Sequence, residues 1–183
     1  MGQRQSKLAP RTLAELRNQT NFSVEELQEW YKEFKASWPK GFLTEDEFKG
    51  VYSNIFPLGD ATEFARHVFR VFDQNKDGLL DFREFMCGFS VVLLGSLEEK
   101  LKFSFNIYDI DGNGFISRNE MSAILSALNK GNFSCGLSQD DPEEKTASIF
   151  NKMDSDCDDN LSVEEFIEGA KKDPFIVKSL NLD

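Results

Sequence analysis

The stretch DIDGNGFISRNE, at residues 109–120, places oxygen-bearing side chains at five positions of a twelve-residue segment. Positions one, three, five, nine and twelve are Asp109, Asp111, Asn113, Ser117 and Glu120. Position six is Gly114, which permits a left-handed turn, and position eight is the apolar Ile116. Alternate side chains of a tightly curled loop converge on one point, which suits Ca²⁺, a hard cation that takes about seven oxygens. The pattern therefore predicts a calcium-binding loop in which the backbone carbonyl of Phe115 is the ligand at position seven.

Two other segments repeat this spacing. They are DQNKDGLLDFRE at residues 73–84 and DSDCDDNLSVEE at residues 154–165. The candidate ligands of the first are Asp73, Asn75, Asp77, the carbonyl of Leu79, Asp81 and Glu84. Those of the second are Asp154, Asp156, Asp158, the carbonyl of Asn160, Ser162 and Glu165. One such match could be an acidic surface loop between helices, but three matches in register predict three Ca²⁺ sites of the EF-hand type.

Helical patterns flank the loops, as a helix–loop–helix repeat requires. Before the loop at 73–84, apolar residues recur on one helical face at Phe64, Val68, Phe69 and Phe72. Three serine–glutamate pairs have the spacing of a capping box, which marks the first turn of a helix: Ser96 and Glu99, Ser117 and Glu120, Ser162 and Glu165. We expect the apolar eighth residue of each loop to pair with its counterpart in a neighbouring loop.

EF-hands occur in pairs, so three of them predict a fourth. The segment ASWPKGFLTEDE at residues 36–47 fits, with Gly41 at position six, Leu43 at position eight and Glu47 at position twelve. Positions one, three and five, however, are Ala36, Trp38 and Lys40. These residues offer no carboxylate and add a fixed cation, and Pro39 stiffens the loop. We therefore expect a loop that is kept as structure and does not bind calcium.

The chain is thus predicted to be all-α, with four EF-hands in two compact, paired lobes. A length of 183 residues suits this arrangement. We expect an N-terminal segment at residues 1–22, one EF-hand pair at 23–93, a second pair at 97–175 and a C-terminal tail at 176–183.

The loop at 154–165 departs from the pattern because its sixth residue is Asp159 instead of glycine. A left-handed conformation costs an L-residue roughly 1–2 kcal/mol, although Asp tolerates it better than most. That cost corresponds to at most about a tenfold loss of affinity. Repulsion among the many carboxylates of this loop favours any cation that enters. We therefore expect a working but weakened site.

Composition excludes several classes of function. The chain carries 32 acidic residues against 21 Lys and Arg, a net charge of −11, which argues against nucleic acid as a partner and suits cations or a basic partner. The three scattered cysteines, Cys87, Cys135 and Cys157, do not suggest a disulfide framework. His67 is the only histidine and has no recognisable nucleophile partner, so we do not expect an enzyme. The first residues lack the apolar core of a secretory signal, which predicts a cytoplasmic chain.

The N-terminus, MGQRQSKL, matches the pattern for myristoylation of Gly2 once Met1 is removed. The first twenty residues are also locally basic, with Arg4, Lys7, Arg11 and Arg17 against Glu15. One myristoyl chain binds membranes only weakly, and each nearby cation adds about 1 kcal/mol at an anionic surface. We therefore expect reversible, peripheral attachment to membranes.

Several segments together resemble the neuronal calcium sensor family. They are the start MGQRQSKL, ELQEWYKEF, FARHVFRVFDQNKDG, YDIDGNGFISRNEM and EEFIEGAKKDPFIVKSL. They look most similar to the hippocalcin, neurocalcin and visinin-like branch, and the similarity covers nearly the whole chain. One departure is Trp38-Pro39, where the family usually has Cys-Pro.

The resemblance implies that calcium exposes a hydrophobic groove that takes an amphipathic helix of a target protein. Carried over to this chain, the groove would draw on Trp30, Phe34, Phe48, Val51, Tyr52, Phe56, Phe85 and Phe89. It also implies a monomer or weak dimer, N-myristoylated, in which calcium can expose the lipid.

The prediction that follows is a calcium sensor that regulates target proteins at membranes. Two alternatives remain open at this point. One is a cytosolic calcium buffer, which binds the ion without opening. The other is a constitutively membrane-anchored regulatory subunit that depends on calcium.

Overall fold

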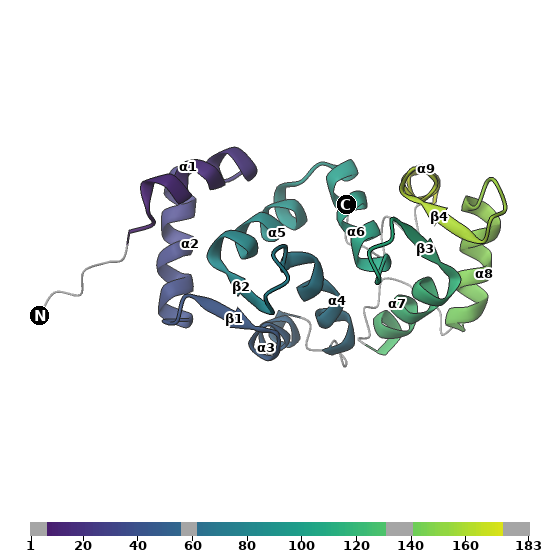
Figure 1. Cartoon of the computed structure of the whole chain (residues 1–183), viewed down its shortest axis with the longest axis horizontal. Helices are drawn as coiled ribbons and strands as arrows, with labels where there is room; N and C mark the ends of the chain where they lie inside the picture. The colour runs from purple at the N-terminus through teal and green to yellow at the C-terminus, as the bar shows by residue number, and fades with distance from the viewer. Residues whose placement is uncertain (1–6, 56–61, 131–140, 174–183) are drawn as a thin grey trace, which may run out of the picture.

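The structure is a computed structural model and describes residues 7–55, 62–130 and 141–173. Its helices form two groups that lie side by side along the longest axis of the molecule (Figure 1). In the described residues the only other regular elements are four strands of three residues each, which confirms the predicted all-α class.

The first group contains the elements α1 (Pro10–Gln19), α2 (Val24–Ser37), β1 (Phe42–Thr44), α3 (Glu45–Ile55), α4 (Thr62–Phe72), β2 (Leu79–Asp81) and α5 (Phe82–Leu94). The second contains α6 (Leu97–Tyr108), β3 (Phe115–Ser117), α7 (Arg118–Lys130), α8 (Pro142–Met153), β4 (Asn160–Ser162) and α9 (Val163–Lys172). Apart from α1, each group is two helix–strand–helix units, as the repeat predicts.

Each pair of loops is joined by a short antiparallel sheet. Leu43 of β1 lies opposite Leu80 of β2, and Ile116 of β3 lies opposite Leu161 of β4. All four side chains are fully buried. The prediction that the apolar eighth residues pair is therefore confirmed, and burial of these residues explains why they are apolar.

Helix starts follow the predicted capping pattern. Reciprocal bonds join Ser96 to Glu99, Ser117 to Glu120 and Ser162 to Glu165. Three further capping boxes were not predicted: Ser23 with Glu26, Thr44 with Glu47, and Asp81 with Glu84. In the three predicted calcium loops the capping glutamate is the residue at position twelve, so the carboxylate that starts the helix is also a candidate ligand.

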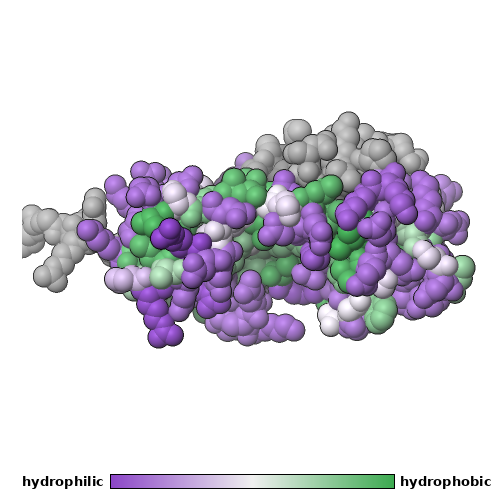
Figure 2. Space-filling view, turned by 90° about the horizontal axis from the view of Figure 1, so that it is seen from above, coloured by the Kyte–Doolittle hydropathy of each residue, from purple (hydrophilic) through white to green (hydrophobic). Residues whose placement is uncertain are grey.

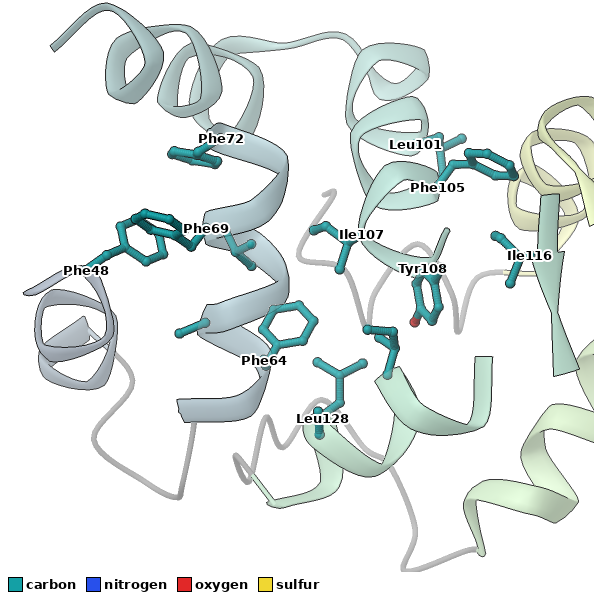
Figure 3. Packing of buried hydrophobic residues seen from close by; sticks show 14 of the residues in the cluster. Phe48, Phe64, Phe69, Phe72, Leu101, Phe105, Ile107, Tyr108, Ile116 and Leu128 are labelled. Carbon is teal, nitrogen blue, oxygen red and sulfur yellow. The ribbon is translucent and has the colours of Figure 1, made fainter. Parts of the chain in front are cut away.

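The two groups of helices share apolar contacts. Phe64 on α4 points towards Leu128 on α7, and Ile107 on α6 points towards α4 (Figure 3). Phe72 at the end of α4 meets Phe103 of α6, with ring centroids 5.7 Å apart. All five residues belong to, or pack against, one hydrophobic core, so helix α4 is the main element of the first group that contacts the second.

Two glycines allow helices within a unit to approach closely. A Cβ atom at Gly88 of α5 would lie 2.7 Å from the ring of Phe72 on α4. A Cβ atom at Gly169 of α9 would lie 2.4 Å from Cγ of Met153 on α8. Both distances are too short for a real contact, so a side chain at either position would require the neighbouring side chain or the helices to shift.

Helix α1 was not predicted, although its sequence contains the signals. Pro10 occupies its first turn, and Leu16 is fully buried. Beyond its end, the N–H of Asn21 donates to Oγ of Ser90 at 2.9 Å, and Nδ2 donates to the carbonyl of Leu94 at 3.3 Å. The N-terminal segment is thus attached to α5.

Candidate calcium-binding sites

The loops at 73–84, 109–120 and 154–165 share one hydrogen-bond scheme at position one. In each, the position-one carboxylate accepts bonds from the N–H groups at positions five and six, at distances of 2.9–3.2 Å. The residues that accept are Asp73, Asp109 and Asp154. Asp73 and Asp109 are buried, and the bonds curl the loop around them.

Positions three and five follow the same scheme. The side-chain oxygen at position three accepts from the N–H at position five, and the oxygen at position five accepts from the N–H at position seven. The acceptors are Asn75 and Asp77, Asp111 and Asn113, Asp156 and Asp158. Each acceptor side chain is thereby turned into the loop, where the spacing predicts the ion.

The glutamate at position twelve joins both ends of each loop. One oxygen accepts from N–H groups at positions two or three, and the other accepts from position nine. The residues are Glu84, Glu120 and Glu165. Both oxygens of each carboxylate are thus held at the mouth of the loop, in the place that bidentate coordination needs.

The same hydrogen bonds, together with burial, shift the pKa values of these carboxylates. Burial raises the pKa of Glu84 despite bonds from the N–H groups of Asp81 and Asn75. For Glu120, burial raises the pKa, but bonds from Ser117, Asp111 and Ile110 outweigh it, so the pKa falls. Burial thus opposes the charged form most clearly at Glu84, which would gain most from a nearby cation.

Carboxylate oxygens also cluster closely enough for one ion. Those of Asp109, Asp111 and Glu120 all lie within 4.8 Å of one another. Those of Asp154, Asp156 and Asp158 satisfy the same limit. Oxygen donors at these distances suit Ca²⁺, which accepts a loosely arranged shell of oxygens at 2.3–2.6 Å.

The loop at 36–47 is built differently. Its backbone closes through a bond from the N–H of Gly41 to the carbonyl of Trp38 at 2.9 Å. The ammonium group of Lys35 donates to the carbonyl of Pro39 at 2.8 Å. Glu47 accepts only local bonds from Thr44 among the hydrogen bonds of this loop. A lysine cation beside the loop and the lack of acceptors at positions one, three and five support the prediction that no calcium binds here.

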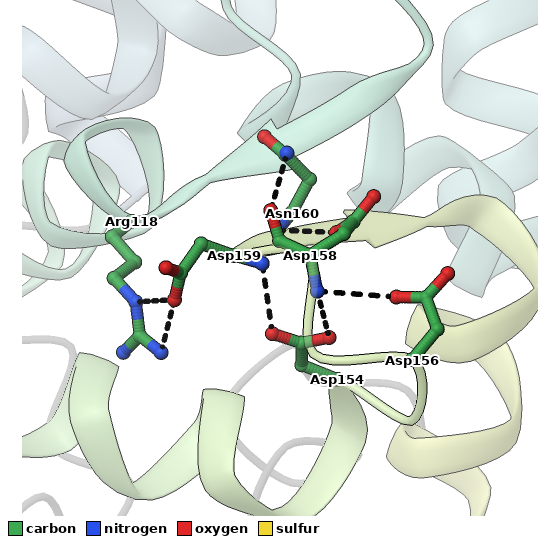
Figure 4. A network of polar contacts seen from close by, with 6 residues as sticks. All are labelled: Arg118, Asp154, Asp156, Asp158, Asp159 and Asn160. Carbon is green, nitrogen blue, oxygen red and sulfur yellow. Dashed lines mark hydrogen bonds and ion pairs between the residues drawn. The ribbon is translucent and has the colours of Figure 1, made fainter.

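Asp159 has a partner that the sequence did not reveal. Its backbone is left-handed, with φ of 63°, as a glycine's would be at this position. Its Oδ1 accepts a hydrogen bond from Nε of Arg118 at 2.8 Å and forms an ion pair with Nη2 at 2.8 Å (Figure 4). Arg118 follows β3 at position ten of the facing loop, and its guanidinium lies over the ring of Phe150 at 4.5 Å. The side chain of Asp159 therefore points away from the ion site and ties the loop to its neighbour.

Comparison with known proteins agrees with this geometry. An EF-hand domain pair matches residues 98–171, and an EF hand matches residues 65–86. Neuronal calcium sensor 1 of Lymnaea stagnalis is 42% identical over 185 residues, which cover 100% of this chain and 97% of the relative. The protein of that name from Aplysia californica is 43% identical with the same coverage. The chain belongs to the neuronal calcium sensor family.

A further relative is guanylyl cyclase-activating protein 2 of Lithobates pipiens, 40% identical over 93% of this chain and 89% of the relative. These relatives confirm the predicted family. Together with the clustered acidic residues, they also confirm Ca²⁺ as the predicted metal ion. Neither name is that of an enzyme, and the expectation that this chain is not one stays a prediction. The closer likeness to the hippocalcin, neurocalcin and visinin-like branch and the number of ions stay predictions.

The predicted groove residues of this neuronal calcium sensor divide into two sets. Phe34 and Phe48 are buried in the core. Partly exposed residues are Trp30, Val51, Tyr52, Phe85 and Phe89, while Phe56 lies outside the described residues. Ring contacts connect α2 to α5: Trp30 with Phe89 at 5.3 Å, and Phe34 with Phe85 at 5.7 Å.

Apolar residues are also exposed elsewhere. Val92, Leu93 and Leu94 at the end of α5 and Leu97 at the start of α6 are each more than 40% exposed. The connection between these helices lies at the top of Figure 1, and the view from that side shows apolar patches between hydrophilic side chains (Figure 2). Gly2 lies outside the described residues, and none of the described helices is long and apolar enough to cross a membrane.

Proposed function

We propose that this protein is a calcium sensor whose loops at 73–84, 109–120 and 154–165 each bind one Ca²⁺, while the loop at 36–47 binds none. The shared hydrogen-bond scheme of the three loops carries this proposal, because it turns the candidate ligands of each loop towards one point. The proposed units are the EF-hand pairs at residues 23–93 and 97–175.

The response to calcium begins at the glutamate in position twelve. Glu84 lies in the first turn of α5, one residue before Phe85. An ion that takes both oxygens of Glu84 pulls on that turn. The same helix carries Phe85 and Phe89, whose rings contact Phe34 and Trp30 of α2. A movement of α5 therefore changes the aromatic contacts on which the predicted groove depends, and exposes apolar surface to an amphipathic helix of a target protein.

Attachment to membranes is the second part of the proposal. A myristoyl group on Gly2 and the basic residues Lys7, Arg11 and Arg17 would hold the cytoplasmic protein reversibly at an anionic membrane surface. The pairing of Arg11 with Glu15 at 3.1 Å offsets part of its charge, so Lys7 and Arg17 carry more of the attraction.

A hydrophobic dye and the two native tryptophans test the sensor proposal together. Trp30 contacts Phe89, and Trp38 contacts Phe85 at 6.5 Å, so both tryptophans report on α5. Calcium should increase dye binding and shift tryptophan emission, and Glu84→Gln should reduce both changes. Calcium binding by calorimetry without any change in dye or emission would instead indicate a buffer.

Liposome sedimentation tests the membrane proposal. Acylated protein should sediment with anionic liposomes in calcium and be released by a chelator, whereas Gly2→Ala should stay in solution while still binding calcium. Equal sedimentation with and without calcium would make the lipid a constitutive anchor.

A further inference from the structure

Arg70 lies on α4 in the first group of helices, but its side chain binds the backbone of the second group. Its Nη1 donates to the carbonyls of Asp109 and Ile110, at 2.8 and 2.9 Å. Its Nη2 donates to the carbonyls of Asn106 and Ile107, at 2.7 and 3.0 Å. One guanidinium thus satisfies four backbone carbonyls of another lobe.

These carbonyls lie at the point where helix α6 becomes a calcium loop. Helix α6 ends at Tyr108, and the last carbonyls of a helix have no partner within it. A cation at this end is also favoured by the helix dipole. Asp109 and Ile110 are positions one and two of the loop at 109–120, so Arg70 fixes both the end of the helix and the start of the loop.

The environment of Arg70 makes this contact specific. The residue is partly buried, and its Nε atom is buried without a hydrogen-bond partner among the described residues. Burial lowers the pKa of Arg70, while the charges of Asp109, Glu120 and Asp111 oppose that shift. Its two terminal nitrogens bind the end of α6 and the start of the following loop, while Nε stays without a hydrogen bond, which costs free energy.

Arg70 is also close to the calcium loop of its own lobe. It lies three residues before Asp73, the first ligand of the loop at 73–84, and one turn of α4 links the two. We propose that Arg70 is a positioning residue for the loop at 109–120, through which calcium at 73–84 raises the calcium affinity of 109–120. This inference rests on the proposed function, because it requires both loops to bind calcium.

The direction of the effect follows from two opposing contributions. The positive charge of Arg70 repels an ion in the loop at 109–120, while its bonds hold the first residues of that loop in place. Calcium at 73–84 orders the end of α4 and so strengthens the second contribution without changing the charge. By reciprocity, calcium at 109–120 must raise the affinity of 73–84 by the same factor.

The test is a cycle of four proteins with a reporter for one loop. All carry Phe115→Trp, Trp30→Phe and Trp38→Phe, so that tryptophan emission reports only on the loop at 109–120. Phe115 suits this purpose because it is 46% exposed and because its candidate ligand atom is the backbone carbonyl oxygen, which the substitution keeps. The cycle combines Glu84→Gln, which removes calcium binding at 73–84, with Arg70→Lys, which keeps the charge but loses the planar fork of donors.

With Arg70 present, Glu84→Gln should weaken calcium binding at the reporter loop by about fivefold or more, within the usual range of coupling between sites. With Arg70→Lys, Glu84→Gln should change it by less than about twofold. Equal effects of Glu84→Gln in the two backgrounds, or no effect in either, would overturn the proposal.

Arg66 provides the matched control. It lies one turn earlier on α4 and pairs with Glu45 of its own lobe at 3.4 Å, so Arg66→Lys should leave the fivefold effect intact. Loss of the effect in Arg66→Lys as well would assign it to α4 in general and overturn the role of Arg70.

Glu120→Gln separates a failure of this inference from a failure of the proposed function. If the reporter responds to calcium and Glu120→Gln abolishes the response, the loop at 109–120 binds calcium. The comparison of the four proteins then tests the role of Arg70. A different outcome is that calcium leaves the reporter unchanged and that Glu120→Gln does not lower the number of ions detected by calorimetry. The proposed site at 109–120 is then wrong, and Arg70 positions no calcium loop. Circular dichroism at saturating calcium must show equal helix content in all four proteins.

Discussion

The loops at 109–120 and 154–165 face each other in one sheet and share the hydrogen-bond scheme described above, but they differ where the backbone is left-handed. In the first loop both left-handed residues are glycines, Gly112 with φ of 73° and Gly114 with φ of 90°. In the second they are Cys157 with φ of 60° and Asp159 with φ of 63°. The second loop thus adopts the same shape with residues that resist it.

The difference shows how a residue of the loop at 109–120 can offset the conformational cost of a left-handed residue in the loop at 154–165. The ion pair between Arg118 and Asp159 is exposed, with 40% and 74% of the side chains accessible, so it contributes at most about 1 kcal/mol. The contact of Arg118 with Phe150 adds roughly 0.5–1 kcal/mol. Together these are similar to the roughly 1–2 kcal/mol of a left-handed L-residue. We therefore expect Asp159 to weaken the site at 154–165 less than the sequence alone predicted, while the left-handed Cys157 adds a cost of its own.

The largest expected effect is the loss of calcium binding at one of the two loops. Glu120→Gln and Glu165→Gln each remove one charged closing ligand, so each should reduce the calorimetric stoichiometry from three ions to two. If the unaltered protein binds two ions and Glu165→Gln changes nothing, the loop at 154–165 does not bind calcium.

The next effect comes from placing a left-handed Asp in the loop at 109–120, as the loop at 154–165 has at Asp159. Gly114→Asp should weaken calcium binding at 109–120 by about tenfold, because the left-handed strain has no local compensation. No heavy atom lies within 4 Å of a Cβ placed at Gly114. Calorimetry or the emission of Phe115→Trp would measure the change, with Gly50→Ala on α3 as a control in an equally open position. Unchanged affinity would mean that the left-handed position tolerates Asp by itself.

A smaller effect would remove the compensation from the second loop. Arg118→Gln should weaken binding at 154–165 by about two- to fivefold, since it removes an exposed ion pair and a cation–π contact. In the unaltered protein this part of the affinity should decrease with added salt, and Arg118→Gln should reduce that dependence. An equal loss at 109–120 would show that Arg118 acts on both loops and not through Asp159.

The smallest effect should come from restoring glycine. Asp159→Gly relieves strain but also removes the partner of Arg118, so the affinity at 154–165 should rise by less than about threefold. In the Arg118→Gln background the same change should give a larger gain, approaching about tenfold. A tenfold gain with Arg118 in place would show that the ion pair contributes nothing.

Local patterns of the chain predicted most of the fold. Ligand spacing identified the three loops, the eighth residues such as Leu80 and Ile116 predicted the sheet pairing, and serine–glutamate spacing placed the helix starts. These features depend on residues within one twelve-residue segment or on its repetition. The sequence is sufficient there because the geometry is local.

The remaining features depend on contacts between distant residues. Arg118 and Asp159 are 41 positions apart, and Arg70 and Asp109 are 39 apart, so no spacing rule connects them. The burial of Phe34 depends on the packing of α2 against α5, and that of Phe48 on the packing of α3 against α4; the aromatic pattern alone does not determine either. Helix α1 was missed because its apolar residues are few, although Leu16 is fully buried.

The glycine at position 88 has a consequence for how such a protein can be altered. A methyl group there would lie 2.7 Å from the ring of Phe72, so the ring or the helices α4 and α5 would have to shift, and none of the three nearest atoms belongs to a candidate calcium ligand. The resting contact of α4 with α5 is therefore set by a residue that is not a candidate ligand. Because calcium is proposed to act by moving α5, a change at position 88 should also change the calcium affinity of the loop at 73–84.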